Sequence, residues 1–131
     1  MLVVDASVLA PALADDGPDG DVARRRLTGE VLTAPELIDL ETASVIRRAT
    51  LTAGMPLRRA ELALTDLAAI PIARVPHREL LPRCWELRDN LTIYDASYVA
   101  LAELLEVVLV TADQRLAGAP NVRARVEVLG A

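Results

Sequence analysis

Short runs of apolar residues alternate along the chain with longer amphipathic stretches. The runs 2–4 and 107–111 are apolar and rich in valine, which is typical of strands buried in a sheet. The run 70–75 contains Pro71 and predicts a strand at the edge of the sheet, where proline is tolerated. Residues 122–129 alternate apolar and charged side chains, and therefore predict a final strand with one solvated face.

Between these runs, apolar residues recur at the spacing of an α-helix. The predicted helices cover residues 22–27, 36–53, 56–69, 80–88, 95–106 and 113–117. In helix 56–69 we expect Leu57, Leu64 and Leu67 to share one face with Ala68. Glycine, proline and aspartate around residues 15–21 predict a loop. Strands separated by helices predict an α/β fold, a three-layer sandwich with a central, mostly parallel sheet flanked by helices.

Length and composition limit the class of protein. A chain of 131 residues, 53% hydrophobic and 25% charged, predicts a single domain over residues 1–131 with a core of its own. The net charge of −5 argues against a non-specific binder of nucleic acid or anionic membranes. The start of the chain does not resemble a signal peptide, and no apolar run approaches the length of a membrane span. We therefore expect a cytoplasmic protein without a membrane partner.

Two residue counts exclude further chemistry. All 14 basic residues are arginine, so a lysine Schiff base, a Walker P-loop and the lysine of receiver domains are absent. Cys84 is the only cysteine, which excludes an intramolecular disulfide and a cysteine-based zinc site. A cysteine count of one is also typical of a reducing compartment.

Carboxylates stand where a parallel sheet would place a ligand site. Asp5 closes the first strand, and Asp113 follows the strand 107–111 by two residues. Sites in parallel sheets form beyond the carboxyl ends of strands, and a right-handed crossover returns Asp113 to the edge that carries Asp5. Asp95 opens the helix that leads into that strand. Structural roles stay open for each acid: Asp5 with Ser7 could form an Asx turn. Asp95 and Asp113 could each be a helix N-cap.

Glu41 is a fourth acid in an unusual position. Its neighbours one helical turn away include Leu37, Ile38 and Val45, so the carboxylate interrupts a largely apolar face. A charge there is costly unless it is paired or bound to a metal. Four carboxylates in one cleft repel each other and select a hard cation such as Mg²⁺ or Mn²⁺. Such ions serve phosphatases, polymerases and nucleases in cutting or making phosphodiesters.

Four segments of the chain resemble the motifs of PIN domains, and more specifically those of the VapC toxins of bacterial VapBC toxin–antitoxin pairs. The segments are VVDAS, PELIDLETASVIRR, LTIYDASYVALAE and VTADQRL, and together they span Val3 to Leu116 in the order of the family. The resemblance implies a PIN-domain endoribonuclease that cuts RNA with Mg²⁺ or Mn²⁺. In such an enzyme a metal-activated water attacks the phosphodiester in line.

The resemblance also assigns roles to particular residues. It implies that the catalytic acids are Asp5, Glu41, Asp95 and Asp113. In the family, the acids that match Asp5 and Asp95 hold the metal directly. Those that match Glu41 and Asp113 complete the acidic pocket, either directly or through water.

Three further residues are expected to support the acids. Ser7 and Thr111 fall within the family's first and last motifs, and Ser44 stands where family members often carry asparagine. The implied partners are an RNA substrate, a cognate VapB-type antitoxin and a second copy of the chain in a homodimer.

Two other classes of protein are compatible with acids at strand ends. A flavodoxin-like phosphatase requires a second aspartate two residues after the first, where this chain has Ser7. A receiver domain requires the lysine that is missing. A non-catalytic PIN-like module that binds RNA or a partner without cutting stays open as the alternative to the nuclease.

Overall fold

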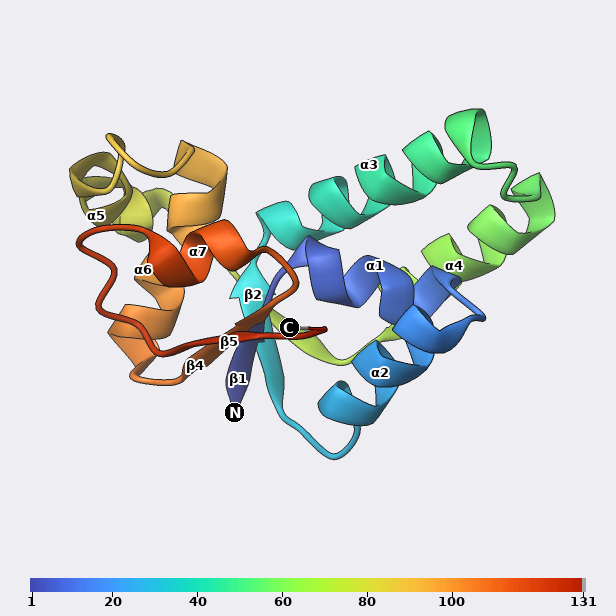
Figure 1. Ribbon diagram of the computed structural model, residues 1–131, viewed down its shortest axis with the longest axis horizontal. Helices are drawn as coiled ribbons and strands as arrows, with labels where there is room; N and C mark the ends of the chain where they lie inside the picture. Colours follow the sequence, from blue (N-terminus) through green and yellow to red (C-terminus); the bar gives the residue numbers. More distant parts are fainter. Residues whose placement is uncertain (131) are drawn as a thin grey trace.

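A five-stranded sheet forms the centre of the computed structural model, which describes residues 1–130 (Figure 1). The strands are β1 (Leu2–Val4), β2 (Leu32–Pro35), β3 (Ile72–Val75), β4 (Val108–Thr111) and β5 (Val126–Val128). They lie in the order β3-β2-β1-β4-β5, and every neighbouring pair is parallel. The predicted α/β architecture is confirmed, and so is the edge position of β3.

Helices cover both faces of this sheet. They are α1 (Ala6–Ala14), α2 (Pro18–Leu27), α3 (Leu37–Thr52), α4 (Leu57–Ala69), α5 (Leu81–Glu86), α6 (Ile93–Leu105) and α7 (Gln114–Gly118), with the short 3₁₀ helix η1 (Arg78–Leu80) before α5. In Figure 1, α1 to α4 lie on one side of the strands, and α5 and α6 lie on the other. Among residues 1–130, no helix combines the length and the apolar character that a bilayer span requires.

Two elements of the fold were not predicted from the sequence. Strand β2 has only four residues and ends in Pro35, which was interpreted as part of a helix start. Helix α1 contains Pro11 and its apolar residues show little helical periodicity, so the pattern gave no signal for it. Two boundaries also differ by four residues. Helix α2 begins at Pro18 inside the expected loop, and residues 122–125 lie outside the final strand.

Helix α6 is the most deeply buried helix. All seven residues from Ala96 to Ala102 are buried, as expected for a helix that is apolar on every side. The first turn of α6, which carries Asp95, is thereby fixed against the sheet. Helix α4 packs differently from the prediction: its buried residues are Ala60, Ala63 and Leu67.

The predicted face of α4 is therefore wrong in part. Leu57 is 68% exposed and Leu64 is 41% exposed, whereas Leu67 is buried as expected. Small alanines on α4 allow close packing against Ala14 of α1 and Ile46 of α3. The periodicity of leucines identified the helix correctly, but close packing of helices selected the face with the smallest side chains.

Candidate active site

Two of the predicted acids meet because their strands are neighbours. Strands β1 and β4 are parallel, with Val4 opposite Val110, so their carboxyl ends lie at the same edge of the sheet. Asp5 follows β1 directly, and its backbone N–H donates to the carbonyl of Val110 at 3.3 Å. Asp113 follows β4 by two residues. The crossover predicted from the sequence is therefore confirmed.

Asp5 is held by a network of hydroxyl groups. The residue is only 6% exposed. Its Oδ1 accepts from the backbone N–H of Ser7 at 3.0 Å and from the Ser7 hydroxyl at 2.5 Å. Its Oδ2 accepts from the hydroxyl of Thr111 at 2.5 Å. The Ser7 hydroxyl in turn accepts from the backbone N–H of Ala112 at 2.8 Å, which ties α1 to the end of β4.

Both interpretations of Asp5 are therefore compatible. Its bond to the Ser7 N–H is the expected turn, and it caps the N-terminus of α1. The cap uses Oδ1. It therefore fixes the orientation of the carboxylate, which stays at the carboxyl end of β1. Ser7 and Thr111, both expected to support the acids, are brought into direct contact with Asp5.

Asp95 and Asp113 begin their helices in different ways. The N-cap of α6 is Thr92, whose hydroxyl accepts from the backbone N–H of Asp95 at 3.0 Å, so the N-cap role considered for Asp95 is wrong. The Asp95 carboxylate is thus not used as a cap. Asp113 is the N-cap of α7, and its carboxylate also accepts from the guanidinium of Arg115. The N–H of Asp113 donates to Thr111 Oγ1 at 3.0 Å.

Glu41 accepts a hydrogen bond from a tyrosine on another helix. The Tyr98 hydroxyl, on α6, donates to Glu41 Oε1, on α3, at 2.6 Å. Tyr98 is only 1% exposed. Tyr98 was not predicted as a site residue, although it lies three positions after Asp95 and so shares its helix face. That spacing was the available signal.

Ser44 is not brought into this network. It lies on an exposed part of α3, and its hydroxyl makes no hydrogen bond within residues 1–130. It lies one helical turn after Glu41 on α3, but Ser44 is exposed whereas Glu41 is half-buried. Of the three residues expected to support the acids, Ser7 and Thr111 contact Asp5, whereas Ser44 lies at the surface.

Burial and neighbouring negative charge raise the pKa of three of the four acids. Burial raises the pKa of Asp5 and of Glu41, and the charge of Asp95 raises both further. Burial also raises the pKa of Asp95 itself, with a contribution from the charge of Asp113. The pKa of Asp113 is lowered, because Arg115 donates hydrogen bonds to its carboxylate. Asp95 is therefore the acid through which the charges of the other three are coupled.

The donor set fits a hard divalent cation, although it is not a closed cage. Within residues 1–130, no three acids, histidines or cysteines converge closely enough to hold a metal ion by themselves. All donors at this edge are carboxylate or hydroxyl oxygens, the ligands that Mg²⁺ and Mn²⁺ prefer. Mg²⁺ is usually held by one or two carboxylates and keeps several waters, so it does not need three protein ligands.

Comparison with known proteins identifies the family. The family model of the PIN domain matches residues 2–121, and the chain belongs to this family. Its curated relatives are VapC ribonucleases. Ribonuclease VapC1 of Mycobacterium tuberculosis is 40% identical over 128 residues, which are 97% of this chain and 96% of the relative. The PIN family predicted from the four motifs is confirmed.

Solved structures share the fold. VapC20 of Mycobacterium tuberculosis, described as a sarcin-ricin loop cleaving toxin, aligns with a TM-score of 0.72 at 17% identity, over 95% of this chain and 99% of that chain. VapBC2 of Rickettsia felis, solved with a DNA fragment from its promoter, aligns with a TM-score of 0.68 at 12% identity, over 97% of each chain. The three-layer PIN fold is thus confirmed.

Proposed function

We propose that this chain is a divalent-metal-dependent endoribonuclease and the toxin of a type II toxin–antitoxin pair. The observation that carries the proposal is that Asp5 and Asp113 follow the neighbouring parallel strands β1 and β4 and are linked through the hydroxyl of Thr111. The charge of Asp95 on α6 acts on Asp5 and on Glu41 of α3, which supports a role for all four acids. This arrangement occurs in a PIN-domain chain 40% identical to a ribonuclease over nearly its full length. PIN-domain ribonucleases depend on a divalent metal, and Mg²⁺ or Mn²⁺ suits these oxygen donors.

Each acid has a separate task in this proposal. Asp5 and Asp95 hold the ion directly, and Glu41 and Asp113 act on it directly or through water. The bound ion supplies activation of the attacking water and neutralises charge on the cleaved phosphodiester. Asp5 is suited to its task because three hydrogen bonds fix both of its oxygens. Glu41 is fixed by Tyr98 through Oε1 alone, which leaves Oε2 available for a water molecule.

Supporting residues keep the acids in position. Ser7 and Thr111 orient the Asp5 carboxylate and connect it to the end of β4. Ser44 is proposed as a further supporting residue, because it lies one helical turn after Glu41 on α3. Arg115 holds Asp113 as a cap of α7, and its largely exposed guanidinium is available to a phosphate.

The proposed partners follow from the relatives. The substrate is RNA, as the names of the VapC ribonucleases state for those proteins. The inhibitor is a VapB-type antitoxin, the partner with which VapC proteins assemble. The site of action is the cytoplasm, and residues 1–131 act as one PIN domain.

Removal of divalent metal is expected to abolish RNA cleavage by the purified chain. Incubation of a defined single-stranded RNA with the protein and EDTA should leave the RNA intact, and an excess of Mg²⁺ or Mn²⁺ should restore cutting. The readout is the set of products on a denaturing gel. Cleavage that persists in EDTA would contradict the metal-dependent nuclease. Binding of RNA without cutting under any metal would favour the non-catalytic module instead.

Tyr98→Phe is expected to reduce the cleavage rate about tenfold, because a group that orients an acid at a metal site typically contributes 10–100-fold. The Tyr98 hydroxyl lowers the pKa of Glu41, so its removal raises that pKa. The acidic limb of the pH–rate profile should therefore shift to higher pH. Tyr94→Phe is the matched control, since Tyr94 is 61% exposed on the same helix. An unshifted profile for Tyr98→Phe would show that Tyr98 does not position Glu41.

A homodimer is the expected state of the free chain. Helices α3 and α4 expose large apolar side chains, including Leu40 (73%), Leu51 (65%) and Leu57 (68%). Large apolar side chains left exposed in this number are typical of a surface that a second protein covers. Size-exclusion chromatography with light scattering should give twice the chain mass of 14.1 kDa. A mass of one chain at micromolar concentration would contradict the dimer.

A further inference from the structure

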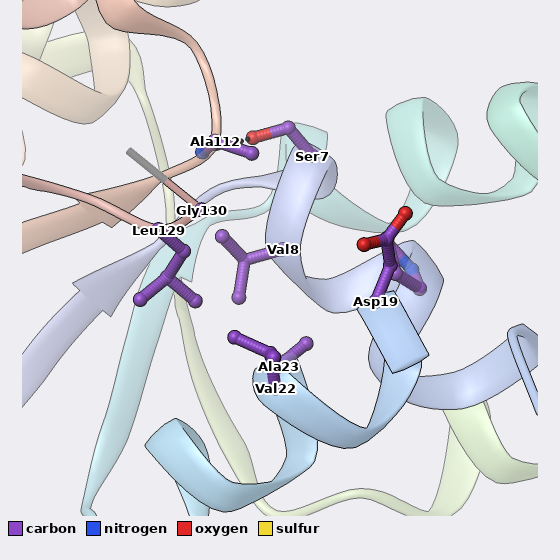
Figure 2. Close-up of a pocket in the computed structure, with 9 residues that line it drawn as sticks. Ser7, Val8, Asp19, Val22, Ala23, Ala112, Leu129 and Gly130 are labelled. Carbon is purple, nitrogen blue, oxygen red and sulfur yellow. Dashed lines mark hydrogen bonds between the residues drawn. The ribbon is translucent and has the colours of Figure 1, made fainter. Parts of the chain in front are cut away.

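A cavity of about 300 Å³ opens next to the acids, between α1, α2 and the chain that follows β4 and β5. Figure 2 shows three aliphatic side chains around it: Val8 of α1, Val22 of α2 and Leu129 after β5. Ligand pockets span about 300–1,000 Å³, so this cavity has room for one small ring system and not for a peptide helix. Its walls suit the flat apolar faces of such a ring.

The cavity shares a wall with the acidic site. Ser7 and Ala112 line it, and the Ser7 hydroxyl accepts from the Ala112 N–H at 2.8 Å. The same hydroxyl donates to Asp5 Oδ1 at 2.5 Å. One side chain therefore separates the cavity from the carboxylate at the centre of the proposed chemistry. A phosphodiester held by the acids would place a neighbouring nucleotide at the opening of the cavity.

Asp19 contributes a carboxylate to the wall of the cavity, and this carboxylate prefers hydrogen-bond donors. It lies in the first turn of α2, lines the cavity and is exposed. Its carboxylate forms no ion pair with any residue from 1 to 130, whereas Asp21 in the same turn pairs with Arg24. An ionised carboxylate only accepts hydrogen bonds. It therefore selects a ligand that presents N–H donors, and a base with two adjacent donors would engage both oxygens.

We propose that this cavity binds one base of the RNA substrate next to the cleaved phosphodiester, and that it favours guanine. Guanine carries the N1–H and N2–H₂ donors side by side, which matches the Asp19 carboxylate. Unstacked bases of single-stranded RNA are recognised in this way, by apolar contacts to the ring and hydrogen bonds to its edge. The inference rests on the proposed ribonuclease function and adds a base-specific subsite to it.

Val22→Trp tests the cavity by filling it. Val22 is 37% exposed, so a larger side chain can enter the cavity without displacing the core. The assay digests an RNA pool of random sequence with Mg²⁺ and sequences the new ends. The wild-type chain should cut beside guanine at one fixed position, and Val22→Trp should reduce that preference at least about tenfold. Val31→Trp is the matched control: Val31 is 60% exposed, precedes the amino end of β2, whereas the acids follow carboxyl ends of strands, and should leave the preference unchanged.

Asp19→Asn tests the hydrogen bonds without filling the cavity. The ratio of cleavage beside guanosine to cleavage beside inosine, whose base lacks the N2 amino group, should fall about tenfold in this variant. Asp21→Asn removes an acid from the same helical turn and serves as the matched control. Thermal unfolding of all four variants verifies that they are folded.

The outcomes separate the subsite from the nuclease. If Val22→Trp and Asp19→Asn cut RNA with the base preference of the wild type, the subsite is wrong and the proposed ribonuclease stands. A wild-type chain that cuts without any base preference overturns the subsite in the same way. If the wild-type chain cuts no RNA with either metal, the proposed function and the subsite both fail.

Discussion

Asp95→Asn is expected to reduce RNA cleavage at least about a thousandfold while the chain still folds, because the variant loses a carboxylate ligand of the metal. Asp95 carries the largest expected effect since its charge acts on both Asp5 and Glu41. Asparagine has nearly the same size, and the backbone N–H that Thr92 caps is retained. The change therefore removes charge and leaves the start of α6 intact. Asp5→Asn should cause a comparable loss of cleavage.

The measurement combines activity with metal binding. Cleavage of a defined RNA is followed in Mg²⁺ and in Mn²⁺, and Mn²⁺ affinity is measured separately by calorimetry. Asp66→Asn, an exposed acid on α4, is the control and should cut like the wild type. Circular dichroism checks that each variant is folded. Wild-type cleavage by Asp95→Asn with added metal would refute the four-acid site.

Thr111→Val carries the second largest expected effect, because it changes both stability and activity. Thr111 is fully buried. Its hydroxyl donates to Asp5 Oδ2 and accepts from the Asp113 N–H. Valine has the same shape but leaves both groups unpaired, which costs about 1–3 kcal/mol of unfolding free energy. Because Asp5 loses one of the groups that orient it, the cleavage rate should fall about 10–100-fold.

Thr33→Val separates these two effects. Thr33 lies on strand β2, two strands away from β4, is 2% exposed, and donates its hydroxyl to the carbonyl of Ala73 at 2.9 Å. The control thus loses a buried hydroxyl that has no contact with the acids. Urea unfolding should show both variants destabilised, and only Thr111→Val should lose cleavage beyond what its unfolded fraction explains. Equal activity of the two variants would show that Thr111 does not orient Asp5.

The sequence predicted most of the fold because the signals for it are local. The apolar runs that became β1 and β4 needed no tertiary information, since continuous valine and leucine are typical of strands covered on both faces. Helix α3 was predicted within one residue at each end, and Gly54, with φ of 70°, stands just beyond it as a stop. The elements that escaped, β2 and α1, carry prolines and little periodicity.

The sequence also predicted where two of the candidate acids lie relative to each other. The acids fall at the ends of strands and at the start of a helix, so a parallel topology was enough to place Asp5 and Asp113 together. The expectation for Ser7 and Thr111 came from the motifs, and both contact Asp5. Tyr98 was missed because its partner Glu41 is 57 residues away along the chain. No spacing rule connects side chains on two helices that meet only after folding.

The sequence by itself determined which residues are acidic, which segments are strands and helices, and that the strands run parallel. These properties depend on side-chain chemistry and on periodicities of a few residues. Only the tertiary structure decided that Asp5 is buried, that Tyr98 holds Glu41, and that a cavity with Asp19 adjoins the acids. Burial, raised pKa values and cavities arise from segments distant in the chain, because solvent is excluded only when several elements pack together.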